Sequence, residues 1–130
     1  MTKQQALQVN TTAMAYLGDA LYEVKIREYV LAQVPSDVNQ AHRIAVKYVS
    51  ANGQAKAAKT MLAASFLTDD EERLLKRARN HRTMSKPSNA DPKNYKIATG
   101  FEALIGYLHL IGDEARLQEI VDEAVRIIEE

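Results

Sequence analysis

Residues 16–23 read YLGDALYE and place a single acid, Asp19, in the most apolar part of the N-terminal half of the chain. A second lone acid, Glu102, has the same setting in residues 99–108, TGFEALIGYL. Burying a carboxylate costs free energy unless the charge is paired or bound to a metal. Two such acids, on segments that we expect to pack together, predict one shared site.

Both acids lie in apolar or small surroundings, and each has a glycine or an alanine beside it where another helix can approach. Hard cations such as Mg²⁺ take oxygen ligands, usually one or two carboxylates together with water and substrate phosphates. Such an ion activates water and stabilises a departing oxyanion in phosphodiester hydrolysis. The spacing alone leaves two interpretations open: a metal site, or a buried acid that is hydrogen-bonded to a tyrosine or a backbone amide.

The rest of the sequence predicts an all-α protein. Prolines occur only at positions 35, 87 and 92, and no stretch shows the sustained alternation of a β-strand. A chain of 130 residues fits one domain, residues 1–130. We predict about six to seven helices. Six of them have these boundaries: about Thr11–Ala32, Val38–Val49, an alanine-rich helix ending near Ser65, Asp69–Asn80, Pro92–Ile111 and Asp113–Ile128.

Local signals indicate where these helices begin and end. Thr68 with Glu71 three residues later has the form of a capping box, and Asp91 before a proline is a typical N-cap. Residues 50–53, SANG, predict a short turn. Residues 81–90, HRTMSKPSNA, are polar, basic and proline-containing, and they predict a mobile loop.

The charge is balanced overall but not locally. The chain has 17 basic and 17 acidic residues, so its net charge indicates no class of partner. Between Arg73 and Lys96 there are eight basic residues and one acid, whereas between Asp113 and Glu130 there are seven acids and two arginines. This asymmetry is compatible with a nucleic-acid-binding face and also with an ordinary solvated helix and loop.

The composition also bears on the compartment. There is no cysteine, which excludes disulfides and thiolate metal sites. Residues 1–10 are polar and lack the apolar core of a signal peptide. The longest apolar stretch, residues 101–111, contains Glu102 and His109 and is too short to span a bilayer. We therefore expect a cytoplasmic protein.

Two motifs resemble those of a known family. YLGDALYE resembles the signature helix of ribonuclease III catalytic domains, which centres on Leu-Gly-Asp-Ala. FEALIG, residues 101–106, resembles the second acidic motif of the same family. The order, the separation and the helical context of the motifs match as well. Within the family the chain most resembles the short bacterial branch, Mini-ribonuclease III, which lacks a double-stranded-RNA-binding domain, and we expect none here.

Two positions depart from the full-length enzymes of that family. Those enzymes carry another acid four residues before the signature aspartate, where this chain has Ala15. They also carry an aspartate three residues before the second glutamate, where this chain has Thr99. Both replacements resemble the Mini branch. They leave Asp19 and Glu102 as the two strong carboxylates of each active centre, and they leave the number of bound metals open.

The resemblance implies the fold of the ribonuclease III catalytic domain and a Mg²⁺-dependent endoribonuclease, with Mn²⁺ as a substitute ion. Asp19 and Glu102 are then the catalytic and metal-binding residues. Cleavage of double-stranded RNA is implied to leave 5′-phosphate and 3′-hydroxyl ends, and the substrate implied for the branch is the precursor of 23S ribosomal RNA. Whether a ribosomal protein assists is left open.

Family members act as homodimers, in which two active centres flank one RNA duplex. In this chain Tyr16 and Leu17 occupy signature-helix positions suited to that interface. Packing in the core of one subunit explains the two residues equally well. The sequence therefore leaves both interpretations open.

Without a separate binding domain, the catalytic domain has to supply its own cations for RNA. A-form RNA is recognised mainly through its shape, its phosphates and its 2′-hydroxyls. Our candidates for these contacts cluster at the end of the helix predicted over residues 69–80 and in the loop that follows. They are Lys76, Arg79, Arg82 and Lys86.

Other polar and aromatic residues are weaker candidates for the site. Glu23 is better explained as a helix-surface partner of Arg27 than as a further metal ligand. The histidines show no metal-ligand spacing. Tyr95 and Tyr107 are better explained as core residues than as groups that stack on bases.

Two alternative functions remain open. A non-catalytic double-stranded-RNA-binding or ribosome-associated helical module would bind duplexes without cutting them, and its structure would keep Asp19 and Glu102 apart. A helical protein-interaction domain would neither bind nor cut RNA. The relative position of the two acids, and whether the basic residues from Arg73 to Lys86 form one face, discriminate among these functions.

Overall fold

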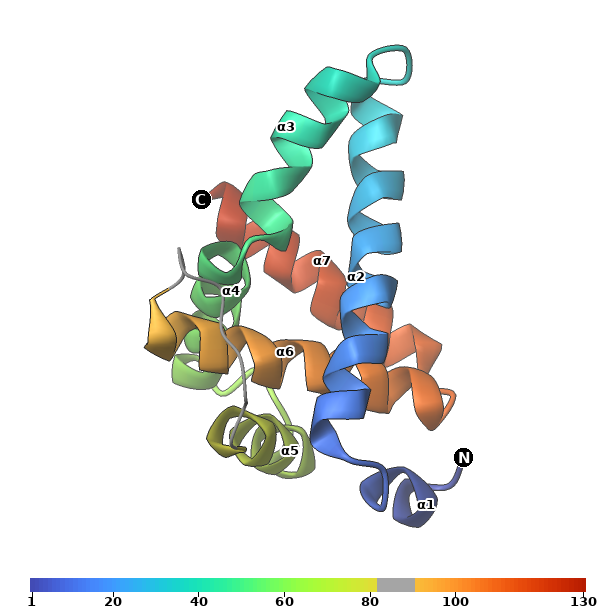
Figure 1. The fold of residues 1–130 in the computed structure, drawn as a ribbon, viewed down its shortest axis with the longest axis vertical. Helices are drawn as coiled ribbons and strands as arrows, with labels where there is room; N and C mark the ends of the chain where they lie inside the picture. Colours follow the sequence, from blue (N-terminus) through green and yellow to red (C-terminus); the bar gives the residue numbers. More distant parts are fainter. Residues whose placement is uncertain (82–90) are drawn as a thin grey trace.

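The computed structural model describes residues 1–81 and 91–130 (Figure 1). Within these residues it contains seven α-helices and no strand, so the all-α prediction is confirmed. The helices are α1 Lys3–Leu7, α2 Thr11–Gln33, α3 Val38–Val49, α4 Ala51–Ala63, α5 Asp69–Asn80, α6 Pro92–Leu110 and α7 Glu114–Glu129. Arg82 and Lys86, and the loop predicted over 81–90 apart from His81, lie outside the described residues.

The predicted capping residues begin the helices to which they were assigned. The Thr68 hydroxyl accepts a hydrogen bond from the Glu71 backbone N–H at 3.2 Å, and the Glu71 carboxylate accepts one from the Thr68 N–H at 2.9 Å. At the start of α6, the Asp91 carboxylate accepts the Lys93 N–H at 2.8 Å. These side chains satisfy backbone donors that have no partner within the helix. The bounds of α5 and the start of α6 consequently agree with the prediction, and so do the bounds of α3, whose N-cap is Asp37.

Two features of the N-terminal half differ from the prediction. Helix α1 was not predicted, because it is a single turn with one buried residue, Ala6, and shows no periodicity. The turn predicted over residues 50–53 is wrong. Ser50 ends α3 and also caps α4, its hydroxyl accepting the Gly53 N–H at 3.1 Å. Gly53 therefore lies inside α4.

Helix α6 lies at the centre of the fold and packs against α2, α4, α5 and α7, with α1 also touching it (Figure 1). Its C-terminal half is buried on nearly every side, which explains why residues 101–108 are almost continuously apolar. Tyr107 belongs to this core, as predicted, whereas Tyr95 is only half-buried. Because α2 crosses α6 with the most extensive contact in the fold, the two acidic motifs meet inside the bundle.

Helix α7 is tied to the other helices by polar contacts. The Glu129 carboxylate accepts hydrogen bonds from the hydroxyls of Tyr29 at 2.5 Å and Tyr48 at 2.8 Å, which joins α7 to α2 and α3. Arg116 donates two hydrogen bonds to the buried Glu71 carboxylate, at 2.8 and 2.9 Å, which joins α7 to α5. In the part of the chain that the structure describes, no helix has the length and apolarity needed to cross a membrane.

Candidate active site

The site begins with two glycines that let α2 and α6 touch through their backbones. A Cβ atom built on Gly18 would lie 1.7 Å from the backbone oxygen of Glu102. One built on Gly106 would lie 2.1 Å from the backbone oxygen of Met14. Real atoms do not approach so closely, so any side chain at either position would force the helices apart. The glycine of each acidic motif therefore has a physical role: it sets the separation of the segments that carry Asp19 and Glu102.

This crossing brings the two predicted acids together. The carboxyl group of Asp19 lies close enough to that of Glu102 to raise its pKa. Glu102 is half-buried, whereas Asp19 is exposed. Both acids have small or apolar helical neighbours as expected, but only the Glu102 side chain is partly covered by the protein.

The environment of Glu102 disfavours its charge. Burial is the main cause that raises the pKa of its carboxyl group to about 8, and the nearby Asp19 carboxylate is the second cause. The amide of Gln54 acts in the opposite direction, because its Nε2 donates a hydrogen bond to Glu102 Oε2 at 3.2 Å. The two carboxylates thus lie close together in a partly buried site. Among the described residues, no cationic side chain bonds to either of them.

A buried aromatic pair lies near Glu102. The rings of Tyr22 and Phe101 pack edge to face with centroids 5.1 Å apart, and both side chains are fully buried. The Tyr22 hydroxyl donates to the backbone oxygen of Tyr48 at 3.1 Å. Burial raises the pKa of Tyr22, with smaller contributions from Tyr48 and Glu102. This aromatic pair therefore lies close enough to Glu102 for the Tyr22 hydroxyl to sense its charge.

The oxygen atoms at this crossing fit a hard divalent cation. Among residues 1–81 and 91–130 there is no group of three or more histidines, cysteines or acids suited to a metal. The donors that do meet are the carboxylates of Asp19 and Glu102. One or two carboxylates with retained waters is the usual protein contribution to a Mg²⁺ site. A cation would also relieve the repulsion that raises the pKa of Glu102.

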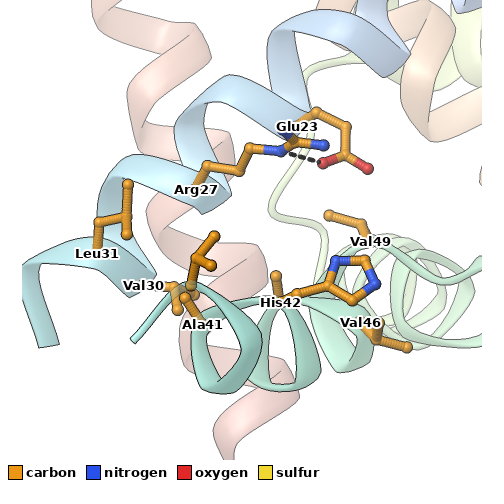
Figure 2. A pocket seen from close by; sticks show the side chains of 10 residues that line it. Glu23, Arg27, Val30, Leu31, Ala41, His42, Val46 and Val49 are labelled. Carbon is orange, nitrogen blue, oxygen red and sulfur yellow. Dashed lines mark hydrogen bonds and ion pairs between the residues drawn. The ribbon is translucent and has the colours of Figure 1, made fainter. Parts of the chain in front are cut away.

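Glu23 follows the expectation of a helix-surface ion pair. Its carboxylate accepts a hydrogen bond from Arg27 Nε at 3.1 Å. The pair sits at the edge of an apolar groove of about 200 Å³ between α2 and α3 (Figure 2). Val30, Leu31 and Val46 are among the residues that line this groove. Glu23 also lies close enough to Glu102 to act, weakly, on its charge.

The predicted RNA-binding cations are less completely described. Lys76 is exposed on α5, with its amino group 3.6 Å from the Glu72 carboxylate. Arg79 is half-buried, and its Nε donates to Asn80 Oδ1 at 3.1 Å. No hydrogen bond or ion pair of the described residues joins either cation to the acid pair. Lys76 lines an open groove of about 570 Å³ together with other basic residues, and Arg79 does not. The further lining cations are Lys3, Arg73 and Arg77.

Sequence reasoning missed Gln54 and Tyr22 as parts of the site. Gln54 carried a recoverable signal, because it is a polar residue one turn from Ala57 and Ala58 on the small, core-facing side of α4. Tyr22 lies within the signature segment itself, three residues after Asp19. Its helical spacing indicated the core, but nothing local indicated that it would lie near Glu102.

Comparisons with known proteins agree with this architecture. A model of the Ribonuclease III domain matches residues 12–113. The chain is 43% identical over 123 residues to Mini-ribonuclease 3 of Enterococcus faecalis, which covers 95% of this chain and 93% of that protein. It is 38% identical over 130 residues to Mini-ribonuclease 3 of a Thermoanaerobacter species, which covers 100% of this chain and 90% of the relative.

A solved structure is similar as well. The crystal structure of protein FN1578 from Fusobacterium nucleatum superposes with a TM-score of 0.80 at 28% sequence identity, covering 92% of this chain and 93% of the other. The family model spans both acidic motifs and the crossing that joins them. The chain therefore belongs to the ribonuclease III family, in its Mini-ribonuclease 3 branch, and is an endoribonuclease.

Proposed function

We propose that this endoribonuclease cleaves double-stranded RNA in a Mg²⁺-dependent reaction, with Asp19 and Glu102 as its catalytic and metal-binding residues and Mn²⁺ as a substitute ion. The observation that carries the proposal is the meeting of these two carboxylates at the glycine-mediated crossing of α2 and α6. Their convergence argues against a non-catalytic helical module, which has no need to hold two like charges together.

The residues of the chain have separate tasks in this proposal. Asp19 is exposed to the solvent from which substrate arrives, whereas Glu102 is partly buried and accepts a hydrogen bond from Gln54. When bound, Mg²⁺ would supply the activation of water and the stabilisation of the departing oxyanion. Because a metal ligand has to be deprotonated, Glu102 would release its proton as the site fills. The products are 5′-phosphate and 3′-hydroxyl ends.

We further propose that cations following the first turns of α5 bind the RNA backbone. Lys76 and Arg79 are the candidates on the described helix, and Arg82 and Lys86 belong to the segment outside the described residues. Phosphate contacts of this kind position a duplex without reading its bases. The substrate that we propose is the precursor of 23S ribosomal RNA, which the Mini branch implies, in the cytoplasm.

We propose that residues 1–130 form one catalytic domain that acts as a homodimer. Tyr16 is 83% exposed, so packing in the core of its own subunit does not explain it. It heads a stripe on α2 that continues through Ala20 and the exposed Val24 at four-residue spacing. An exposed aromatic ring beside apolar neighbours is a common anchor of protein interfaces. The apolar groove in Figure 2 extends the unpartnered surface along α2.

The test of the proposal is cleavage of a labelled RNA duplex by Asp19→Asn. The wild-type protein is expected to cut the duplex with Mg²⁺ and to stop when EDTA is added. Asp19→Asn is expected to keep its fold and to lose cleavage, because the neutral amide cannot replace a metal-binding charge. Asp122→Asn, an exposed acid on α7, is the matched control and should cut normally. Normal cleavage by Asp19→Asn would refute the assignment.

A further inference from the structure

We propose that Gln54 is a positioning residue for this reaction: its hydrogen bond holds the Glu102 carboxylate in the orientation in which it binds the metal. The inference rests on the proposed function of the acid pair. Gln54 comes from α4, which carries neither acidic motif. The side chain thus adds a third helix to the site.

Hydrogen bonds determine the orientation of the Gln54 amide. Its Nε2 donates to the backbone oxygen of Val49 at 3.0 Å and to Glu102 Oε2 at 3.2 Å. A backbone oxygen can only accept, so the NH₂ group has to face Val49. The same NH₂ group then reaches Glu102. With this amide orientation, Glu102 Oε2 is the acceptor.

The burial of Gln54 makes a purely structural role costly. The residue is 2% exposed, and its Oε1 has no hydrogen-bond partner among the described residues. A buried acceptor without a partner costs free energy, whereas an apolar side chain of similar size would not. The neighbouring Ala55, Ala57 and Ala58 are fully buried and apolar. A polar side chain retained in such a place, at a cost in stability, indicates a requirement of the site.

The junction of α3 and α4, a corner at Ser50, determines where the Gln54 side chain lies. A Cβ atom on Gly53 would lie 2.1 Å from the backbone oxygen of Lys47, so α4 leaves Ser50 in close contact with the end of α3. The last carbonyl groups of α3 have no partner within the helix, and side chains satisfy two of them. Tyr22 donates to Tyr48, and Gln54 donates to Val49. One of the two donors that close this corner, Gln54, also donates to Glu102.

The chemistry of an amide suits this position. Its N–H donates to Glu102 Oε2 and so fixes the direction in which the carboxylate faces. A lysine or an arginine could donate the same hydrogen bond, but its positive charge would repel the cation that the carboxylate has to bind. A neutral donor stabilises the carboxylate and leaves its charge available.

The test measures Mg²⁺ dependence in Gln54→Leu, which keeps the approximate size and removes the donor. The Mg²⁺ concentration for half-maximal duplex cleavage is expected to rise about tenfold, the usual effect of removing a hydrogen bond to a metal ligand. Cleavage should recover at saturating Mg²⁺, and the KM for RNA should not change. Unchanged Mg²⁺ dependence would overturn the inference, and so would a loss of cleavage that Mg²⁺ does not restore.

Asn94→Ala is the matched control. Asn94 also joins α4 to α6, since its Nδ2 donates to Asn52 Oδ1 at 2.9 Å and its Oδ1 accepts from Lys59 at 2.7 Å. It makes no hydrogen bond to Glu102. Its variant is expected to keep the wild-type Mg²⁺ dependence. A similar Mg²⁺ shift in both variants would show that general loosening of α4 and α6 is responsible, which contradicts a specific role.

A second measurement needs neither cleavage nor a variant. In the RNA-free wild-type protein, the side-chain NH₂ resonances of Gln54 should move as Mg²⁺ is added, whereas those of Gln118, which bonds to Asp122 on α7, should not. A stationary Gln54 resonance would overturn the inference even if Gln54→Leu fails to fold. The outcome for Asp19→Asn is independent: if that variant cuts RNA normally, the proposed function itself is wrong, whatever Gln54 does.

Discussion

Substituting Gly18 by alanine tests whether the backbone contact of α2 with α6 controls the site. The added methyl group would start 1.7 Å from the backbone oxygen of Glu102, and Cβ atoms do not come closer than 3.0 Å to such a neighbour. The helices therefore have to separate by more than 1 Å along this direction. The obstructing atom belongs to the backbone, so no side-chain rotation relieves the clash. Asp19 moves with α2, and Glu102 moves with α6.

Two effects on stability oppose each other in this variant. Alanine favours a helix over glycine by about 1 kcal/mol. Overpacking a close contact costs about 1–3 kcal/mol, and the rigid neighbour places this case at the upper end. The net loss in the free energy of unfolding is then about 2 kcal/mol, or a fall in melting temperature of about 8 °C.

The effect on cleavage should be larger than the effect on folding. A displacement of about 1 Å in a catalytic group reduces a rate by roughly 100-fold. We expect Gly18→Ala to remain folded at 25 °C and to cut duplex RNA about 100-fold more slowly at saturating RNA and a fixed Mg²⁺ concentration. Circular dichroism measures the fold, and single-turnover cleavage measures the chemical step.

Gly100→Ala separates a general packing defect from a local one. A Cβ atom on Gly100 would lie 2.6 Å from the backbone oxygen of Leu75, so its clash is with α5 and not with α2. This variant should lose stability while its cleavage at saturating RNA stays close to that of the wild-type protein. If Gly18→Ala is folded and cleaves within about threefold of the wild-type rate, the close approach does not set the geometry of the acids and the reasoning is refuted.

Tyr16→Ala should weaken the proposed homodimer by about 2 kcal/mol, the size of an interface hot spot; sedimentation that shows the same dimer affinity would count against this interface. Glu71→Gln should lower the free energy of unfolding by about 3 kcal/mol, because the partly buried Arg116 loses its charged partner; a change below about 1 kcal/mol in urea denaturation would contradict this. The pKa of Glu102, raised to about 8 by burial and then by Asp19, gives the folded protein the higher proton affinity. The contribution of Glu102 to the free energy of unfolding is therefore fully present below the ordinary glutamate pKa. It is lost as the pH rises through about 8. Metal-free wild-type protein should thus melt at a lower temperature at pH 8 than at pH 6, and Glu102→Gln should reduce this difference; an equal difference in both proteins would refute the assignment.

Much of the helical framework was predictable because its signals are local. The capping box at Thr68 and the N-cap at Asp91 act on backbone groups a few residues away, and both appear where the sequence predicts them. The turn predicted at residues 50–53 failed for a tertiary reason. Gly53 matches a turn signal, but its actual task is to let α4 pass close to the backbone of α3.

The candidate site was predictable in its acids and not in its surroundings. An unusual acid in an apolar segment is visible in the sequence, and both Asp19 and Glu102 were found in that way. Their difference in exposure was not visible, since it depends on which helix covers each of them. Gln54 was missed because its importance comes from one contact with a residue far along the chain.

The sequence by itself determined most of the helices, the caps at Thr68 and Asp91 and the two acidic motifs, since periodicity and capping depend on residues within about four positions of each other. Only the tertiary structure decided how those motifs function together. The segment YLGDALYE supplies an acid and a glycine, but the crossing with α6 turns that glycine into the spacer of a carboxylate pair. The α3–α4 corner then supplies the amide that holds Glu102. These contacts join residues that are distant in the chain, and packing of the whole bundle is what brings them within hydrogen-bonding range.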